Sequence, residues 1–158
     1  MKNIFYPYDT ELGKIVIASD GTGITAVQTL SWFEEINKIC EKSADKFTDE
    51  AARQLEQYFA GKRKVFELPL HMSGTSFQKS VWDALRGIPY GRTVTYKHIA
   101  KAVGNEKASR AVGGANHNNP VWIIVPCHRV VGSNGSLTGY AAGVEVKRYL
   151  LELERRFL

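Results

Sequence analysis

Three apolar runs within the first 30 residues, separated by turn residues, constrain the fold of this chain most strongly. They cover residues 4–8, 13–19 and 23–30, and each is typical of a β-strand. Asp20-Gly21 separates the last two runs, and such a pair readily supplies the positive φ angles of a tight hairpin turn. The chain is therefore predicted to begin with a small β-sheet.

Two helices are predicted after these strands. Ser31-Trp32-Phe33-Glu34 fits a capping box, and the apolar helical face that follows includes Cys40, which is expected to be a buried core thiol. A second helix is predicted over residues 49–60, with Gly61 as its end. Residues 65–70 are predicted to return as a short strand.

A lobe boundary is predicted near Gly74. The preceding residues are short of apolar side chains, and Thr75-Ser76-Phe77-Gln78 then fits another capping box. Residues 1–74 are expected to form an α/β domain, and residues 75–158 a mainly helical domain. The expected fold class is thus α/β, in two lobes.

Two short helices in the C-terminal lobe have the outline of a helix-turn-helix. Thr95 can cap a helix over residues 96–103, Gly104-Asn105 supplies a tight break, and a second helix is predicted over residues 106–116. Its paired glycines cost about 2 kcal/mol of helix propensity relative to alanine. Either this helix packs closely on another element, or its exposed face approaches a surface such as a groove wall. Arg110 is its main large side chain among small ones, which are Ala108, Ser109, Ala111, Gly113 and Gly114.

The formal net charge of +5 is unevenly divided. Residues 1–74 hold 9 Lys and Arg against 11 Asp and Glu, whereas residues 75–158 hold 12 against 5. A basic half favours a polyanion partner, because Lys and Arg that neutralise phosphates release counterions. The same charges could also serve solubility alone.

Several compartments and site types are not expected. No run approaches 18 apolar residues, so no membrane span is predicted, and the N-terminus lacks the continuous apolar segment of a secretory signal. Cys40 and Cys127 lie far apart and predict neither a zinc site nor a disulfide framework. A reducing compartment is therefore expected, the cytoplasm or, in a eukaryote, the nucleus.

Cys127 follows an apolar run over residues 121–125 that is predicted to be extended. Pro126 cannot donate into a sheet ladder, so it ends the run and fixes the place of the cysteine. A lone cysteine with apolar neighbours is usually structural. His128 and Arg129 change this interpretation, because a base that titrates near neutrality and a positive charge both favour the thiolate. The sequence thus predicts a nucleophile at Cys127.

The motif Pro126–Val131, PCHRVV, resembles the active-site motif of the O6-alkylguanine-DNA alkyltransferases. Further segments that match this family follow in order on both sides of it: Gly91–Tyr96, Arg110–Ala115, Asn119-Pro120, Gly139-Tyr140 and Leu150–Glu154. Together they cover about residues 75–158, while the N-terminal lobe matches by architecture only. The order of the segments is what makes the resemblance specific.

This resemblance implies an activity and roles for the residues that carry it. The alkyl group of O6-alkylguanine in double-stranded DNA would pass irreversibly to Cys127 after base flipping, once per protein molecule. His128 would take the thiol proton through a water while Glu154 holds the imidazole. Tyr96 would donate a proton to guanine N3 and contact a phosphate. Asn119 would stabilise the turn between the DNA-binding helices and the cysteine.

The resemblance also implies how DNA and substrate are held. Arg110 would fill the gap left by the flipped base, and the small residues of its helix would let that helix lie in the minor groove. The carbonyls of Cys127 and Val130 would bind the guanine amino group. The substrate pocket would be formed by Val130, Tyr140, Ala141, Ala142 and Trp122. Members of the family often have glycine where this chain has Ala142, and the added methyl group would leave less room for bulky alkyl adducts.

Two other classes of function remain open at this point. A non-catalytic helix-turn-helix module could bind alkyl lesions without transferring anything, and a cysteine hydrolase could be acylated at Cys127 and released by water. Neither metal nor organic cofactor is implied, no obligatory protein partner is expected, and the chain is predicted to be a monomer. O4-alkylthymine as a second substrate stays undecided.

Overall fold

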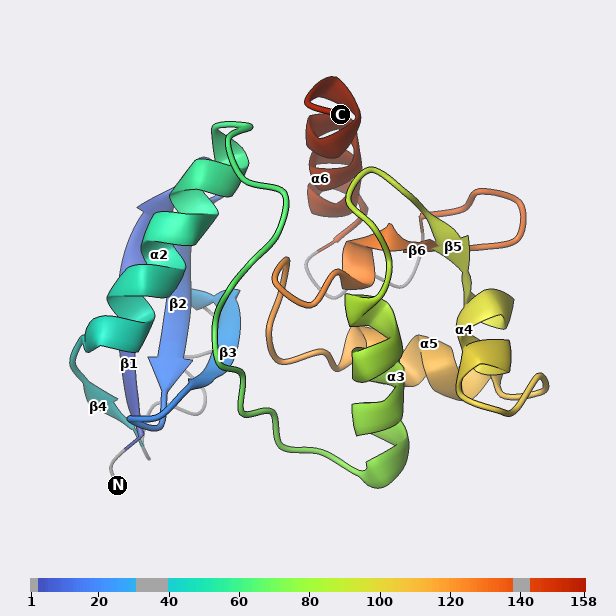
Figure 1. Cartoon of the computed structure of the whole chain (residues 1–158), viewed down its shortest axis with the longest axis horizontal. Helices are drawn as coiled ribbons and strands as arrows, with labels where there is room; N and C mark the ends of the chain where they lie inside the picture. Colours follow the sequence, from blue (N-terminus) through green and yellow to red (C-terminus); the bar gives the residue numbers. More distant parts are fainter. Residues whose placement is uncertain (1–2, 31–39, 138–142) are drawn as a thin grey trace. The chain divides into compact units, whose positions relative to one another are not determined.

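A computed structural model describes residues 3–30, 40–137 and 143–158. The chain forms two compact units, Met1–Ser73 with Pro120–Trp122, and Gly74–Asn119 with Ile123–Leu158 (Figure 1). The first holds a small sheet and the second is mainly helical, so the predicted α/β class is confirmed. The capping box at residues 31–34 lies outside the described residues. No helix within the described ranges is both long and apolar enough to cross a membrane.

The first unit is built on a four-stranded sheet with the strand order β3-β2-β1-β4. The strands are β1 (Ile4–Thr10), β2 (Gly13–Ser19), β3 (Ile24–Thr29) and β4 (Glu41–Lys42). β1 and β3 both run antiparallel to β2, while β4 lies parallel beside the start of β1. The predicted turn between β2 and β3 is present, with Gly21 at a φ of 90° and the Asp20 carboxylate accepting the amides of Thr22 and Gly23.

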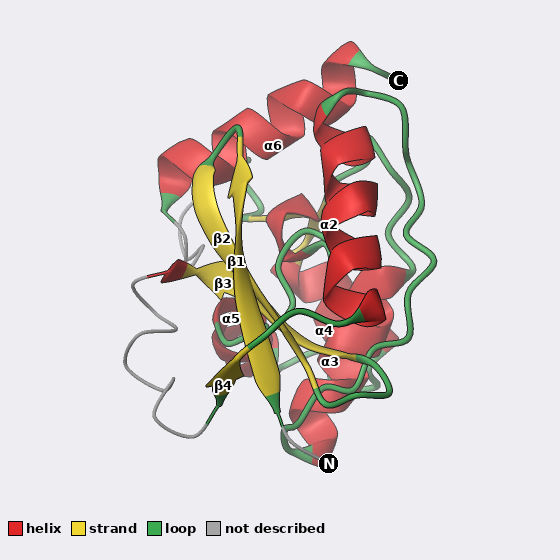
Figure 2. Cartoon of the chain, turned by 90° about the vertical axis from the view of Figure 1, so that its left-hand side faces the viewer, coloured by secondary structure: helices red, strands yellow, loops and turns green. Residues whose placement is uncertain are grey.

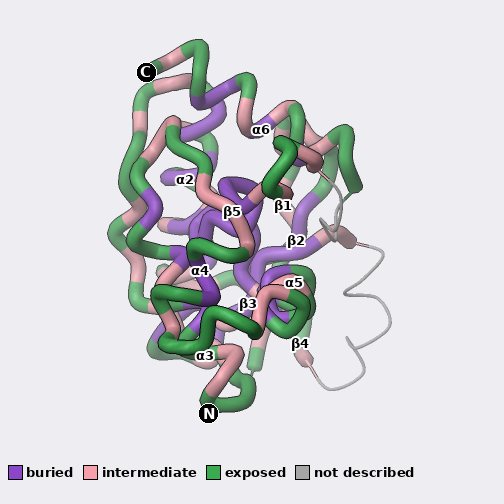
Figure 3. The backbone as a smooth tube through the Cα atoms, turned by 90° about the vertical axis from the view of Figure 1, so that its right-hand side faces the viewer, coloured by how far each residue is buried: buried purple, intermediate pink, exposed green. Residues whose placement is uncertain are grey.

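Both faces of β2 are covered, and Figure 3 shows this strand as buried along most of its length. Side chains alternate along a strand, so Ile15 and Ile17 lie on one face and Val16 and Ala18 on the other. Helix α2 (Lys46–Phe59) packs along one face of the sheet (Figure 2). The other face holds a cluster of Phe5, Val16, Ala18 and Ala26, with Leu30 and Cys40 packed against it.

Three details of the first unit differ from the sequence prediction. α2 begins at Lys46 rather than at residue 49, because Asp45 and Thr48 form a capping box in which a threonine replaces the usual Glu or Gln. Residues 65–70 do not form a strand beyond one bridge from Leu70 to Ile24, since the Gln54 side chain satisfies the backbone of Glu67. Cys40 is half-buried rather than fully buried.

The second unit packs three helices around an apolar core. They are α3 (Ser76–Arg86), α4 (Tyr96–Ala102) and α5 (Ser109–His117). Trp82 of α3 is buried, and its indole N–H donates to the Ala115 carbonyl of α5 over 2.9 Å. The predicted caps are present, with Thr75 and Gln78 forming the capping box of α3 and Thr95 capping α4.

Helices α4 and α5 form the predicted helix-turn-helix. Gly104 has a φ of 86° in the turn between them. The second helix begins later than predicted, at Ser109 instead of residue 106, because the Asn105 side chain accepts the Lys107 amide and its carbonyl accepts the Ala108 amide. These bonds keep residues 106–107 in the turn.

A two-stranded parallel ladder joins distant parts of the second unit. β5 (Val94–Thr95) pairs with β6 (Val130–Val131), with Val94 opposite Val130. β6 follows a single 3-10 turn, η2 (Cys127–Arg129), and α6 (Val144–Arg156) completes the unit. The ladder therefore places the strand that leads into α4 beside the strand that follows η2.

Candidate active site

Cys127 is the first residue of η2, and only 2% of its surface is exposed. The backbone of the turn is held on both sides, because the Arg129 amide donates to the Pro126 carbonyl over 3.0 Å and the Val130 amide donates to the Cys127 carbonyl. The sulfur is therefore carried by an ordered, buried turn.

The run before Cys127 is not the continuous extended segment that was predicted. Val121 pairs with Val27 in the first unit, and Ile123 then adopts a φ of 69°. The left-handed backbone conformation of a β-branched residue is unfavourable by about 1–3 kcal/mol, so the break in the extended run is strained. Asn119, 2% exposed, donates from Nδ2 to the Val125 carbonyl over 2.9 Å and so closes the turn between α5 and the cysteine.

His128 and Glu154 meet in the core although 26 residues separate them. His128 Nε2 lies 2.6 Å from the Glu154 carboxylate, and both side chains are buried. Because a carboxylate only accepts hydrogen bonds, Nε2 carries the proton and Nδ1 carries the lone pair. Within the described part of the chain, this buried Nδ1 has no hydrogen-bond partner. The imidazole is thus oriented as a base by its other nitrogen.

Arg129 and Gly91 complete the surroundings of the Glu154 carboxylate. The Arg129 guanidinium donates to it over 2.8 and 3.0 Å, and the Gly91 amide donates over 3.0 Å. Arg129 was expected to favour the cysteine thiolate, but its contacts show that it neutralises Glu154. It is also 6% exposed and donates to the Ile88 carbonyl, so it is a buried structural partner of the carboxylate.

These contacts set the protonation states of the pair. Burial alone would raise the pKa of Glu154, but the hydrogen bonds and charges of His128 and Arg129 outweigh it and hold that pKa well below its usual range. Burial lowers the pKa of His128, against the opposing effect of Glu154. Glu154 is therefore an anion and His128 a neutral imidazole at neutral pH.

Tyr96, half-buried at the start of α4, lies within electrostatic reach of Cys127. Burial raises the pKa of its phenol, the charge of Cys127 raises it further, and a hydrogen bond from the Asn116 side chain opposes both. The phenol therefore stays protonated at neutral pH, which is the state required of a proton donor.

Lys147 and Asn116 were missed by the sequence interpretation. Lys147 of α6 is fully buried, donates to the Val130 carbonyl over 2.5 Å and lies 5.8 Å from the centre of the Tyr96 ring. Burial lowers its pKa to about 8, while the charge of Cys127 opposes this change. The spacing of Lys147, Leu150 and Glu154 places them on one helix face, which was the available signal.

The buried face of α6 is not purely apolar. Leu150 and Leu153 are buried, whereas Val146 and Tyr149 are half-buried. Lys147 and Glu154 occupy the buried face instead, because they are paired with groups of the second unit. An ordinary solvated role for Glu154 is excluded by its 1% exposure.

The exposed face of α5 is made of Arg110, Ala111, Gly114 and His117, beside half-buried Ala108, Ser109 and Gly113. A methyl group built on Gly114 would meet no atom within 4 Å, and one on Gly113 would only reach ordinary contact with Tyr96 at 4.0 Å. Close internal packing therefore does not require these glycines. The other explanation, an exposed face that approaches a surface, is favoured.

Five further residues were predicted to form the substrate pocket. Tyr140, Ala141 and Ala142 lie outside the described residues. Trp122 is buried in the first unit, where its amide donates to the Val27 carbonyl. Val130 is buried next to η2, and its carbonyl already accepts Lys147. The described residues include no group of three or more His, Cys, Asp or Glu suited to a metal.

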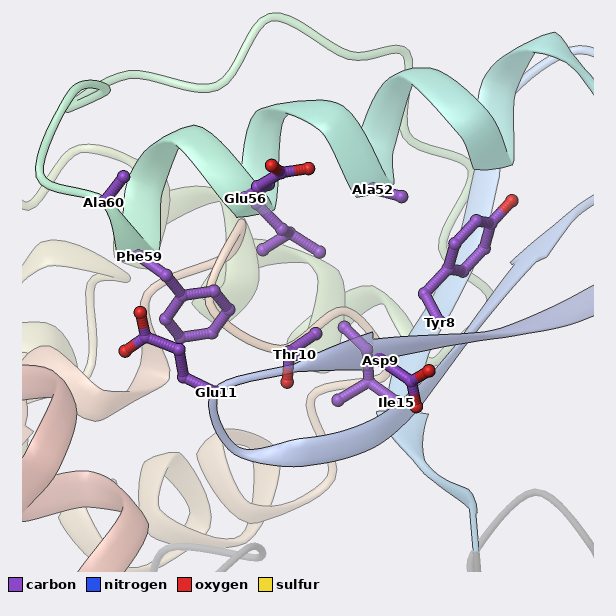
Figure 4. Close-up of a pocket in the computed structure, with 10 residues that line it drawn as sticks. Tyr8, Asp9, Thr10, Glu11, Ile15, Ala52, Glu56, Phe59 and Ala60 are labelled. Carbon is purple, nitrogen blue, oxygen red and sulfur yellow. The ribbon is translucent and has the colours of Figure 1, made fainter.

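A separate pocket of about 700 Å³ lies in the first unit, between α2 and the β1–β2 hairpin (Figure 4). Its lining includes the apolar Ile15 and Phe59 and the acidic Asp9, Glu11 and Glu56. Three carboxylates would repel a phosphate backbone. None of the predicted site residues lines this pocket.

Comparisons with known proteins match both units of the chain. Residues 76–156 match the family model described as 6-O-methylguanine DNA methyltransferase, DNA binding domain, and residues 4–72 match that of its ribonuclease-like domain. A methylated-DNA–protein-cysteine methyltransferase of Methanosarcina acetivorans is 50% identical, covering 93% of this chain and 95% of the relative. The constitutive enzyme of that name from Bacillus subtilis is 45% identical, covering 97% and 96%.

Solved structures give the same result. The O6-methylguanine methyltransferase of Mycobacterium tuberculosis matches with a TM-score of 0.92 at 41% identity, covering 99% of this chain and 94% of that one. The same organism's protein in complex with DNA matches with a TM-score of 0.90 at 42% identity, covering 98% and 94%.

Proposed function

Because the chain belongs to the O6-methylguanine DNA methyltransferase family, we propose that it repairs DNA by moving an alkyl group from guanine O6 to its own Cys127. The observation that carries the proposal is the buried Cys127–His128–Glu154 arrangement, in which a neutral imidazole held by a carboxylate adjoins the cysteine. This arrangement has no use in a module that only binds lesions. The comparisons do not favour that alternative either.

The transfer exchanges one proton for one alkyl group. His128 Nδ1 accepts the Cys127 thiol proton through a water, the thiolate forms a bond to the alkyl carbon, and the bond from that carbon to guanine O6 breaks. The electron pair stays with the base, and Tyr96 gives a proton to guanine N3. The proton held by His128 balances the one that Tyr96 gives. Since the thioether has no route back to the thiol, each molecule reacts once.

Lys147 supports the ionised form of the cysteine. Its ammonium group is buried, so its attraction to a thiolate is less screened than it would be in water. The charge of Cys127 raises the pKa of Lys147, as the negative partner in an ion pair does. Arg129 cannot serve this purpose because Glu154 neutralises it.

Residues 75–158 act as the DNA-binding and transfer domain, with residues 1–74 in support. The exposed, small-faced helix α5 enters the minor groove, and Arg110 takes the place of the flipped base. The protein works as a monomer without a cofactor, in the compartment that holds DNA. Asn119 keeps α5 in register with the cysteine turn through its bond to the Val125 carbonyl.

Intact mass after mixing with duplex DNA that contains O6-methylguanine tests the proposal. One added methyl group per molecule, located on Cys127 by peptide mapping and absent from Cys127→Ala, is expected. An unmodified protein that still binds the duplex would identify a binding module. Demethylated DNA in excess of protein would identify a turnover enzyme. A label on Cys40 would overturn the choice of nucleophile.

A further inference from the structure

Arg129 is a buried charge to which the proposed reaction gives no role. It lies at the end of η2, two residues after Cys127, and 6% of its surface is exposed. Burying a charge is unfavourable unless the charge is paired and hydrogen-bonded, so a buried arginine depends on specific partners. The guanidinium donates to the Glu154 carboxylate and to the Ile88 carbonyl. Its charge is therefore directed at the residue that orients the base.

Two hydrogen bonds join the guanidinium to the carboxylate. Arg129 Nε donates to Glu154 Oε1 over 2.8 Å, and Nη2 donates to Oε2 over 3.0 Å. This bidentate geometry is one that arginine makes and lysine cannot. Nη1 is held separately, by the Ile88 carbonyl at 2.8 Å. His128 Nε2 lies 2.6 Å from the same Oε2, so the carboxylate contacts two groups that can carry a positive charge.

Only one of these two groups can lose its charge. A guanidinium stays protonated in proteins, whereas an imidazole titrates near neutrality. A buried carboxylate is stable only beside a positive partner, and without Arg129 a proton on His128 would supply that charge. The resulting imidazolium would have no lone pair on Nδ1 and could not accept the Cys127 proton. Arg129 supplies the charge without using the base.

The other charged and titratable groups around the imidazole do not take over this task. Burial lowers the pKa of His128 and Glu154 raises it, while the charges of Arg129 and Lys147 lower it further. Lys147 donates to the Val130 carbonyl rather than to the carboxylate. The Tyr90 ring centre lies 5.6 Å from the guanidinium carbon, and burial and Glu154 raise the pKa of its phenol, which is therefore uncharged at neutral pH.

We propose that Arg129 is a positioning residue for the transfer reaction: it neutralises and fixes the Glu154 carboxylate, and so leaves His128 free to accept the cysteine proton. The inference rests on the proposed function and adds a residue to it. The proton leaves the Cys127 sulfur and stops at His128 Nδ1. It does not continue to Glu154, because a carboxylate that accepts hydrogen bonds from Arg129 and the Gly91 amide is a weak base.

Nitrogen-15 NMR of the His128 ring tests this role in the full chain without DNA. The wild-type ring should be a neutral imidazole at pH 7, with its proton on Nε2. Arg129→Met keeps the length of the side chain and removes its charge, so the ring should protonate at a pH at least about one unit higher. Arg148→Met is the matched control, because it breaks an exposed arginine pair on α6, with Glu145 at 3.0 Å, and should titrate like wild type.

The pH dependence of methyl transfer provides a second readout. The measured quantity is the single-turnover rate constant with a saturating duplex that contains O6-methylguanine. In Arg129→Met the fall in rate at low pH should begin about one unit higher than in wild type, because the base is protonated earlier. A loss by the same factor at every pH, with an unchanged ring titration, is the result expected from support of the fold alone, and it would overturn the inference.

If Arg129→Met does not fold, the double variant Arg129→Met/Glu154→Gln decides. It removes both charges, so its imidazole should titrate within about one unit of wild type, where the two charges offset each other. A pKa of His128 lower than wild type by more than this would mean that Arg129 does not neutralise Glu154. An imidazolium in wild type at pH 7 would equally overturn the inference. Failure of wild type to be methylated would instead overturn the proposed function.

Discussion

Gly114→Ala should make the protein more stable and a poorer DNA binder. Gly114 is an exposed residue inside α5, a methyl group added to it would meet no atom within 4 Å, and its φ is not positive. Replacing an interior helical glycine by alanine stabilises a helix by about 0.5–1 kcal/mol. For a chain of this length, that gain corresponds to a rise of about 1–4 °C in the unfolding midpoint.

The same substitution should lower the affinity for DNA if the exposed face of α5 brings its backbone close to the groove. A methyl group forced into a close-packed contact costs about 1–3 kcal/mol, which is a loss of about 5- to 150-fold in affinity. Fluorescence anisotropy with an unmodified duplex at fixed salt measures this loss, and thermal unfolding measures the gain. Reaction with free O6-benzylguanine, which needs no DNA contact, is the control and should be unchanged.

Two results would refute this reasoning. A lower unfolding midpoint in Gly114→Ala would mean that the glycine is required by packing within the protein. Unchanged affinity together with a higher midpoint would mean that α5 does not approach DNA through this face. Ser80→Ala on the exposed side of α3 is the matched helix substitution, and it should leave affinity unchanged.

Three further predictions concern the wedge, the buried base and the reacted protein. Arg110→Ala should slow repair of duplex DNA by at least about tenfold more than reaction with a free O6-alkylguanine base, and equal losses in single-turnover assays would contradict the wedge role. Burial lowers the pKa of His128, so below about pH 6.5 the unfolded protein binds more protons at this residue than the folded protein does. The free energy of unfolding, measured with urea, should therefore fall by up to about 2 kcal/mol between pH 6.5 and pH 5. This dependence on pH should be weaker in His128→Gln. Methylated Cys127 should unfold at a lower temperature than the free thiol, with a loss of about 1–3 kcal/mol, and an unchanged or higher midpoint would exclude this.

Local signals in the sequence were sufficient for much of the fold. The strands and the caps at Thr75 and Thr95 depend on neighbours within four residues, and these predictions are confirmed. The start of α2 was wrong because Thr48 takes the place that Glu or Gln usually has in a capping box. Residues 65–70 were wrong because a side chain of another element, Gln54, satisfies their backbone.

Fewer contacts of the active site could be predicted from local signals in the sequence. Glu154 looks like a solvated helix residue in isolation, and only the family resemblance joined it to His128 across 26 positions. Lys147 and Asn116 belong to residue types that are mostly exposed, and the helical spacing of Lys147 with Leu150 was the one local signal that Lys147 is buried. Their partners are the Val130 and Cys127 carbonyls and Tyr96, which tertiary packing alone brings to them.

The buried charges of the second unit explain why one reaction could both use the cysteine and destabilise the protein. Glu154 carries a negative charge, Arg129 and Lys147 carry positive charges, and His128 is neutral, which leaves one excess positive charge in the core. A thiolate at Cys127 balances this excess, so the site favours the ionised nucleophile. A thioether cannot balance it, and Lys147 then remains buried opposite an uncharged sulfur, which is an unfavourable state for an ammonium group. Lys147→Met should therefore slow transfer and also remove most of the stability difference between the free and methylated proteins, whereas a difference set by packing alone would persist in that variant.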